Sequence, residues 1–357
     1  MKILIVDSSA PFRLLLRTCL SDLPDTEIIG VANNGKKALD MIAHLQPDLI
    51  TLSMKMPDMD GIEILYQMRE KYPHIKVIVV ACSTETDAEK TLKAMELGAF
   101  DFILKPDTNV VDKKTYLQDK LLPEIQQARS LKSVFKRVHV PVKVTPTAVN
   151  AAASPLKTSH KVTRGVFKAD VVAIGSSTGG PAALQEVLSQ LPENFSVPVV
   201  VTQHMPKAFI TSLATRLNQS SPLVCRVAGQ GEVLQAGHVY MAPGDVHMKI
   251  MQRGSALVAQ LEAGVRVNHA IPSVDVTYES LVALSPAVKT LAVVLTGMGN
   301  DGAKGAKLLS EQGNHVLVQN EESSVVWGMA GETFRNGAAN EVLPLADIAK
   351  AMLRHVA

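Results

Sequence analysis

Hydrophobic positions along residues 1–125 come in short runs that alternate with longer amphipathic segments. The runs "KILIV", "EIIGVA", "DLITL", "KVIVVA" and "FDFIL" are rich in β-branched residues, and segments such as "GKKALDMIAHLQ" between them have helical spacing. Strands that alternate with helices in this way form a parallel sheet with helices on both faces. We therefore predict a doubly wound, five-stranded α/β domain over residues 1–125.

This alternation stops over residues 126–169. The segment contains three prolines and many small residues, and no acidic residue occurs from Ile125 to Ala169. A composition of this kind is typical of a tether between domains. We predict a linker over residues 126–169.

A second α/β pattern begins at residue 170. "DVVAIG", "VPVVVTQH" and "TLAVVLTG" are nearly continuous apolar runs, as expected of parallel strands buried on both faces. "AGHVYMAPGDVHMKIMQRGSALVAQL" has short strands and glycine turns, which suggest an antiparallel hairpin added to the sheet edge. We predict a Rossmann-like α/β domain over residues 170–357, with a mostly parallel sheet and this hairpin.

A turn rich in glycine and serine follows the first of these strands. In "VVAIGSSTGGPAAL", Gly175 to Gly179 fits G-x-S-x-G with Ser177 in the middle, after a strand and before a helix. Backbone N–H groups and the helix dipole favour negative charge at such a position. The same turn is also a ready phosphate site. On this motif alone, nucleophilic attack and phosphate binding both remain open.

Two further polar side chains come at the ends of other apolar strands. His204 follows "VPVVVTQ", and Asp301 follows "LAVVLTGMGN". Open α/β sheets carry their sites at the carboxyl ends of the strands, so we expect these residues beside Ser177 as general base and orienting acceptor. The order Ser, His, Asp differs from that of α/β-hydrolases. Each residue alone has a structural alternative, and for Asp301 this is a helix cap.

Composition narrows the possible functions. The chain is 46% hydrophobic and 20% charged, and its net charge of +2 and aromatic content of 4% argue against a nucleic-acid binder. The longest apolar runs are too short for a signal-peptide core or a membrane span, so we expect no membrane insertion. The three cysteines are far apart and match no metal or redox spacing, so we expect a cytoplasmic protein without a metal or other cofactor.

The motifs of the second domain resemble a known family when they are taken together. "IGSSTGGP", "TQHMP", "VYMAPGD", "PSVDV" and "LTGMGNDG" are similar to blocks of the catalytic domain of the chemotaxis protein-glutamate methylesterases, the CheB family, and come in the same order. A receiver domain joined through a linker is also the architecture of that family. The resemblance therefore covers nearly the whole chain.

The resemblance implies an activity and a set of roles. The substrate would be a γ-glutamyl methyl ester in the cytoplasmic helical region of a methyl-accepting chemotaxis receptor, and related enzymes also deamidate receptor glutamines. Ser177 would be the nucleophile, His204 the base and Asp301 the third member of the triad. The backbone N–H of Met298 would stabilise the oxyanion, with Thr178 beside it. No metal is needed for this chemistry.

Two alternatives to a hydrolase remain. One is a module that only binds an anion at the Ser177 turn, and the other is a regulatory adaptor with an inert second domain. The substrate-facing segment also departs from the family. It reads "VNHAIPSVD", with His269, Ala270 and Ile271 where the family usually has basic residues.

The first domain resembles a response-regulator receiver but departs from its phosphorylation site. Asp7 and Lys105 match the pattern, but Ser8 stands where a second acid is usual and Ser53 where the phosphoacceptor aspartate belongs. Mg²⁺ needs clustered carboxylates, and serine cannot form an acyl phosphate. We therefore predict a pseudo-receiver that is not switched by aspartyl phosphorylation. It would keep its fold as a docking or dimerisation surface, and chemosensory kinase or adaptor proteins would be its partners.

Overall fold

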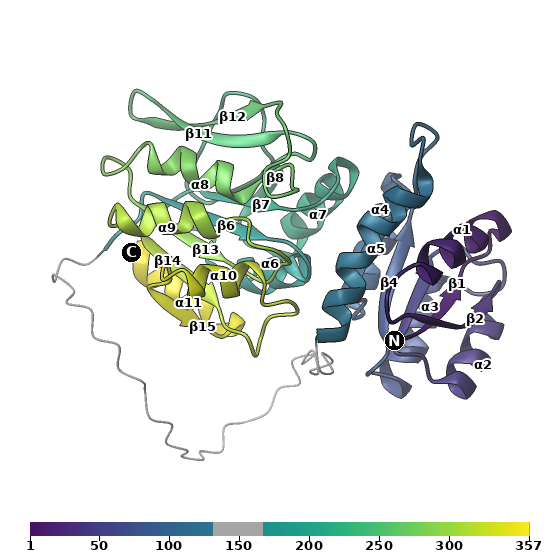
Figure 1. The fold of residues 1–357 in the computed structure, drawn as a ribbon. Helices are drawn as coiled ribbons and strands as arrows, with labels where there is room; N and C mark the ends of the chain where they lie inside the picture. The colour runs from purple at the N-terminus through teal and green to yellow at the C-terminus, as the bar shows by residue number, and fades with distance from the viewer. Residues whose placement is uncertain (131–166, 357) are drawn as a thin grey trace, which may run out of the picture.

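The computed structural model describes residues 1–130 and 167–356, which form two α/β units (Figure 1). In the first unit, five parallel strands lie in the order β2-β1-β3-β4-β5. These strands are β1 (Lys2–Val6), β2 (Glu27–Ala32), β3 (Leu49–Ser53), β4 (Lys76–Ala81) and β5 (Asp101–Leu104). The predicted five-stranded parallel sheet is therefore confirmed.

Helices cover both faces of this first sheet. α1 and α5 pack on one face, and α2, α3 and α4 pack on the other, because alternate side chains of each buried strand point to opposite sides. The helices are α1 (Ala10–Ser21), α2 (Gly35–Leu45), α3 (Gly61–Lys71), α4 (Glu85–Glu96) and α5 (Lys113–Ser130). Most of the expected linker over residues 126–169 lies outside the described residues.

The second unit is built on a parallel sheet of seven strands in the order β15-β14-β13-β6-β7-β10-β8. The strand order changes direction at β6, and such a switch point leaves a crevice at the carboxyl ends of the strands. The strands are β6 (Val171–Ser176), β7 (Val199–Gln203), β8 (Val224–Val227), β10 (His238–Met241), β13 (Thr290–Val294), β14 (His315–Gln319) and β15 (Glu341–Leu343).

Two helical layers enclose the second sheet. The central strands are buried at every position and are mostly apolar, because helices cover both of their faces. One face carries α6 (Gly180–Leu188), α7 (Lys207–Ser220) and α11 (Leu345–Val356). The other face carries α8 (Val274–Val282), α9 (Ala303–Glu311) and α10 (Met329–Arg335).

The predicted hairpin exists but is not part of the main sheet. In a separate antiparallel sheet that lies over α8, β12 (Ala256–Glu262) pairs with β11 (His247–Arg253) on one side and with β9 (Glu232–Val233) on the other. The expectation that the hairpin extends the edge of the main sheet is wrong. The segment "HVYM" instead forms β10, which runs parallel between β7 and β8 because three of its four side chains are buried.

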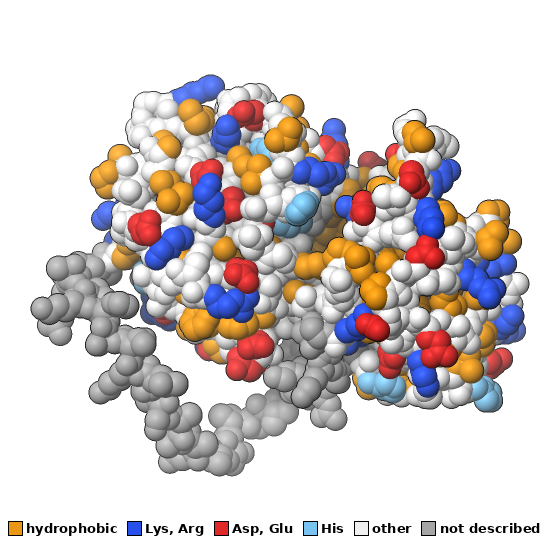
Figure 2. Space-filling view, viewed as in Figure 1, with side chains coloured by type: hydrophobic (Ala, Val, Ile, Leu, Met, Phe, Trp, Pro, Cys, Tyr) orange, Lys and Arg blue, Asp and Glu red, His pale blue; other side chains and the backbone are white. Residues whose placement is uncertain are grey.

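The two units meet along α4 and β5 of the first and α7 of the second. The rings of Phe102 and Phe209 stack with their centroids 4.7 Å apart, and Arg216 forms an ion pair with Glu96. A cleft between α4 and α7 is lined mainly by acidic and hydroxyl side chains, and Figure 2 shows the surface hollowed where the units meet. Among the described residues, no helix is long and apolar enough to cross a bilayer.

Candidate active site

The turn between β6 and α6 separates its two serines. Ser176 is the last residue of β6 and is fully buried, and its Oγ donates a hydrogen bond to Gln203 Oε1 at 2.7 Å. Ser177 is only half-buried and lies at the carboxyl edge of the sheet. Gly179 follows with φ of +78°, and a Cβ there would come within 2.6 Å of Val325. The glycine therefore lets the chain pass under Val325 and into α6.

His204 and Asp301 reach the same edge from the strands on either side of β6. His204 directly follows β7, and Asp301 follows the turn after β13, while the local strand order is β13-β6-β7. The imidazole Nε2 of His204 and Oδ2 of Asp301 are 2.7 Å apart. The structure thus brings the three sequence-predicted side chains to one rim.

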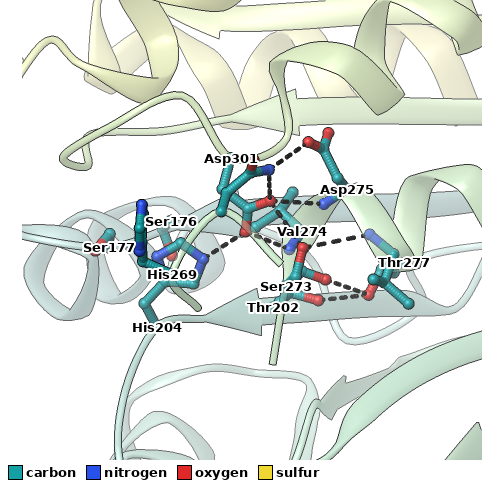
Figure 3. Close-up of polar contacts among 12 residues, drawn as sticks. Ser176, Ser177, Thr202, His204, His269, Ser273, Val274, Asp275, Thr277 and Asp301 are labelled. Carbon is teal, nitrogen blue, oxygen red and sulfur yellow. Dashed lines mark hydrogen bonds and ion pairs between the residues drawn. The ribbon is translucent and has the colours of Figure 1, made fainter. Parts of the chain in front are cut away.

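The Asp301 carboxylate is surrounded by hydrogen-bond donors (Figure 3). Its Oδ2 accepts from His204 and, at 2.7 Å, from the backbone N–H of Val274. Its Oδ1 accepts from the hydroxyl of Ser273 at 2.8 Å, the amide of Asn268 at 2.9 Å and the backbone N–H of Asp275 at 3.2 Å. Asp301 is therefore fixed as an acceptor, and its carboxylate orients the imidazole.

These contacts set the charge of Asp301. Burial acts to raise the pKa of this carboxyl, but hydrogen bonds and the nearby imidazole outweigh it and hold the pKa below its ordinary value. Burial instead raises the pKa of Asp275, which also lies close to the Asp301 charge. The Asn268 amide donates to both carboxyls and so separates two acidic groups that would otherwise repel each other.

The contact with Asp301 decides which imidazole nitrogen of His204 is free. Because Nε2 faces the carboxylate, Nδ1 is the nitrogen that can accept a proton from a hydroxyl. The backbone N–H of His204 donates to Ser176 O at 3.0 Å, which places His204 next to the serine turn. In the described part of the chain, no hydrogen bond joins Ser177 Oγ to the imidazole. Such catalytic contacts often tighten only when substrate is bound.

Two backbone N–H groups beside Ser177 are free to bind an anion. Within the described residues, neither the N–H of Thr178 nor that of Met298 has an acceptor. Thr178 follows the serine, and Met298 lies in the turn after β13, where Gly297 packs against Ser177. Unpaired N–H groups on both sides of a hydroxyl are the arrangement that an oxyanion hole needs.

Sequence reasoning missed the residues that hold Asp301 in place. Asn268 and Ser273 belong to the loop before α8, and His247 opens β11. The Nδ1 of His247 accepts from the Ser273 N–H at 3.2 Å, and its Nε2 lies 2.9 Å from Val265 O. The motif "PSVDV" resembles a family block, but the sequence assigns none of its residues a contact with Asp301. The Ser273 hydroxyl and the Asp275 backbone N–H of this motif both donate to Asp301, and no spacing in the sequence predicts these contacts.

The first unit also contacts the serine turn. The hydroxyl of Thr178 donates a short hydrogen bond to Asp101, at the start of β5. Met298 and Val325 pack against an apolar cluster that contains Val326 together with Leu117 and Leu121 of α5. The rim that carries the candidate oxyanion donors is therefore partly covered by the first unit.

Two carboxyl groups are buried at this contact. Burial raises the pKa of Asp101 to about 6, although hydrogen bonds from Thr178 and Phe102 oppose the rise. Burial and the neighbouring Asp101 raise the pKa of Glu124 in α5 well above its ordinary value, while the positive charge of Lys120 opposes this. Between the ordinary carboxyl range and about pH 6, the packed pair therefore binds more protons than two exposed carboxyls would.

At the candidate phosphorylation site of the first unit, Lys105 forms an ion pair with Asp7. Asp7 is fully buried at the end of β1, and its Oδ2 accepts from Lys105 Nζ at 2.7 Å. Ser53 ends β3 and is also buried, while Ser8 Oγ donates to the carbonyl of Lys55 at 2.9 Å. The Lys55 ammonium turns away to Asp87 at 3.1 Å.

The two acids beyond this site cap helices. Asp58 accepts the backbone N–H groups of Gly35 and Lys36, at the start of α2, and Asp60 accepts that of Ile62 in α3. Their carboxylates are thus committed to helix N-termini.

Both units of this chain are similar to known protein families. The sequence profile of the CheB methylesterase family matches residues 172–352, and that of the response regulator receiver domain matches residues 3–115. A protein-glutamate methylesterase/protein-glutamine glutaminase of Geobacillus kaustophilus is 39% identical over 99% of this chain and 98% of its own length. One of Thermotoga maritima is 35% identical over 99% and 98%. The crystal structure of the Thermotoga maritima CheB methylesterase catalytic domain is 38% identical, with a TM-score of 0.51, over 53% of this chain and 100% of that one.

Proposed function

The chain belongs to the CheB methylesterase family, and we propose that it hydrolyses methyl esters of glutamyl side chains on methyl-accepting chemotaxis receptors and deamidates receptor glutamines. The observation that carries this proposal is the His204–Asp301 pair beside the half-buried Ser177. A module that only binds anions has no need for an oriented imidazole. An inert adaptor would not need an Asp301 carboxylate that accepts five hydrogen bonds and orients an imidazole.

The mechanism follows from the roles that the geometry allows. Ser177 Oγ attacks the ester carbonyl carbon while His204 Nδ1 takes its proton. The N–H groups of Thr178 and Met298 stabilise the negative oxygen of the tetrahedral intermediate. His204 then protonates the leaving methoxide, and methanol departs. Water attacks the acyl-enzyme with His204 again as base, which releases the glutamate carboxylate and restores Ser177. With a glutamine substrate, ammonia leaves instead of methanol.

Methanol release from methylated receptor membranes tests this function. We expect the full-length protein to release methanol in proportion to its concentration, and a preparation in which Ser177 is replaced by alanine to release none above background. If both proteins bind the receptors and neither releases methanol, the adaptor function is correct. Binding of phosphate or a phosphopeptide at the serine turn without ester hydrolysis would favour the anion-binding module.

For the first unit, we propose a pseudo-receiver that is not switched by aspartyl phosphorylation. The Lys105 ammonium already neutralises Asp7, and the buried hydroxyl of Ser53 lies where an aspartate would have to accept the phosphoryl group. One carboxylate is too few to hold Mg²⁺, a hard cation that prefers several oxygen ligands.

We expect acetyl phosphate with Mg²⁺ to leave no acid-labile phosphate on the protein. We also expect no change in Mg²⁺ affinity or esterase rate on addition of beryllofluoride. A receiver with an aspartate phosphoacceptor serves as the positive control. Stoichiometric acid-labile phosphate on residues 1–130, or an activation of about tenfold, which corresponds to about 1.4 kcal/mol of barrier, would disprove the proposal. Phosphoserine at Ser53 would require a separate kinase, and it would be stable in acid.

We propose that the first unit instead restrains activity through its contact with the serine turn. Thr178 donates to Asp101, while Met298 and Val325 lie against the apolar cluster with Leu117 and Leu121. A receptor helix cannot reach this rim along its whole length while the first unit covers it. Separation of the two units by a protein partner would then raise the esterase rate.

The buried carboxyls make this packing sensitive to pH. Burial raises the pKa of Asp101 and of Glu124, and we attribute part of this burial to the contact with the second unit at Thr178, so the packed form binds more protons than the separated form. The resulting stabilisation is fully present below the ordinary carboxyl range, at roughly pH 4. It is lost as pH rises through about 6, the value for Asp101, and further as Glu124 ionises.

We expect small-angle X-ray scattering to show a larger radius of gyration at pH 8 than at pH 5. In the double variant Asp101→Asn, Glu124→Gln, neutral side chains replace both acids, and the radius should no longer change with pH. The matched control is Glu63→Gln, an exposed acid of α3, which should behave as the wild type. An equal pH response in the double variant and the wild type would rule out these two carboxyls as its cause.

A further inference from the structure

Three side chains that commonly ligate metals converge at the amino end of the seven-stranded sheet. His315 opens β14, Glu341 opens β15, and His355 lies in the last turn of α11. The Nε2 atoms of His315 and His355 lie 3.1 and 2.7 Å from the same oxygen, Oε1 of Glu341. One potential ligand atom from each residue lies within 4.8 Å of the other two. We call these three residues the His–Glu–His cluster.

The cluster lies at the opposite end of the sheet from Ser177. Parallel strands place their amino ends along one edge and their carboxyl ends along the other, and Ser177 follows the carboxyl end of β6. Figure 1 shows β14, β15 and α11 grouped near the C-terminus of the chain. The cluster therefore belongs neither to the esterase site nor to the site in the first unit. The three residues are also too far apart in the sequence for a ligand motif, which is why we expected no metal there.

We propose that the His–Glu–His cluster binds a transition-metal dication, with Zn²⁺ as its natural occupant, through His315 Nε2, His355 Nε2 and one oxygen of Glu341. Zinc ligands at about 2.0–2.2 Å from a tetrahedral ion lie roughly 3.3–3.5 Å from one another. The contacts at 3.1 and 2.7 Å need only a small expansion to reach this spacing. Two imidazoles with one carboxylate suit zinc and its neighbours, and they disfavour Mg²⁺ and Ca²⁺.

The surroundings of the cluster are those of a ligand site with an open position. The side chains of His315, Glu341 and His355 are 20%, 26% and 15% exposed, so solvent reaches them and water can supply a fourth ligand. Arg354 binds the second carboxylate oxygen of Glu341 at 2.7 Å, which leaves Oε1 as the single ligand atom. The Phe167 ring lies 5.5 and 5.9 Å from the two imidazoles and forms an apolar wall.

Metal binding requires a change of tautomer in both imidazoles. In the present arrangement, each imidazole directs Nε2 at the same carboxylate oxygen, so its single proton lies on Nε2. On metal binding, each Nε2 gives this proton to water and coordinates through its lone pair, while Nδ1 takes a proton from water, so each neutral imidazole keeps one proton. The charge of Arg354 opposes the cation. We therefore expect weaker binding than in a zinc site with four protein ligands.

A bound ion would join three elements that are distant in the sequence. β14 and β15 are neighbours at the sheet edge, and α11 packs on one face of the sheet. A ligand that binds only the folded chain stabilises it in proportion to the logarithm of its concentration over Kd. The expected function of the ion is thus structural, because its ligands would link the end of α11 to the edge of the sheet.

The test uses full-length protein that has been freed of metal with a chelator. We expect Zn²⁺ to raise the thermal midpoint of the wild type, and Co²⁺ to give visible ligand-field bands typical of four-coordination. His355→Gln should bind zinc at least tenfold more weakly at this site and lose both effects. His238→Gln is the matched control, because His238 lies in the same unit but outside the His–Glu–His cluster, where its imidazole contacts Ala236 O and the ring of Tyr240. Mg²⁺ should not shift the midpoint.

Two outcomes would overturn the proposal. One is wild-type protein that shows neither a midpoint shift nor Co²⁺ bands. The other is a His355→Gln variant that binds zinc with the affinity and stoichiometry of the wild type, which would place the ion elsewhere, for example at His204. Circular dichroism of the metal-free variants checks that they fold. His315→Gln provides a second removal of one ligand if His355→Gln does not fold.

Discussion

Replacement of Ser177 by alanine is expected to reduce ester hydrolysis by about 10⁴- to 10⁶-fold, as for the loss of a nucleophile in other serine hydrolases. The half-buried hydroxyl of Ser177 is the one beside the free N–H groups of Thr178 and Met298. Without it, only substrate binding and oxyanion stabilisation remain. Steady-state methanol release at saturating receptor, measured well below the thermal midpoint, gives this ratio directly.

Ser176→Ala is the control for this experiment, because it removes the adjacent hydroxyl. Ser176 Oγ is fully buried and donates to Gln203, so it cannot reach a substrate. Its loss leaves Gln203 Oε1 unpaired and should lower stability by about 1–3 kcal/mol while most of the activity per folded molecule is kept. Equal losses of activity in the two variants would show that the nucleophile has been assigned to the wrong serine.

Asp301→Asn is expected to lower turnover by about 10³- to 10⁴-fold, the loss seen when an orienting aspartate becomes an amide. The carboxylate accepts five hydrogen bonds, among them those from His204 and Asn268. An asparagine must point its NH₂ group at some of these donors, so the imidazole loses its fixed tautomer. For the same reason the variant should also be somewhat less stable.

The comparison that decides the role of Asp301 is activity per folded molecule against thermal midpoint. A catalytic role predicts a large loss of rate at a temperature where the variant is fully folded. Normal specific activity with a much lower midpoint would make Asp301 a structural residue of the turn before α9. The pH–rate profile adds a second readout. A purely structural defect would lower the rate by the same factor at every pH and leave the apparent pKa values of the profile unchanged.

Much of the architecture could be predicted from hydrophobic patterning because buried parallel strands have a strong signal. The runs that end near Ser177, His204 and Asp301 gave the strands, and the carboxyl-end rule placed these residues at one rim. The hairpin was assigned to the wrong sheet, because "HVYM" and "HMKIM" have similar composition. Which sheet each joins depends on what covers their faces, and short apolar runs do not encode this.

The polar contacts that hold Asp301 and Thr178 in place could not be predicted from the sequence, for a different reason. The loop around Asn268 is irregular, and its contact with Asp301 crosses 33 residues. The contact between Thr178 and Asp101 crosses the two units, so it depends on how the folded surfaces fit together. The His–Glu–His cluster likewise comes from two strand starts and one helix end. Long-range polar contacts of this kind have no period and no fixed spacing from which they could be read.

The Lys105–Asp7 ion pair gives the first unit a built-in countercharge. This cation is part of the chain, so it does not dissociate when magnesium is scarce, and no phosphodonor competes with it. Among several receivers that share one histidine kinase, a pseudo-receiver of the kind proposed here would take no phosphoryl groups from the common supply. A cell could then vary the abundance of this protein without slowing the signals that pass through the other receivers.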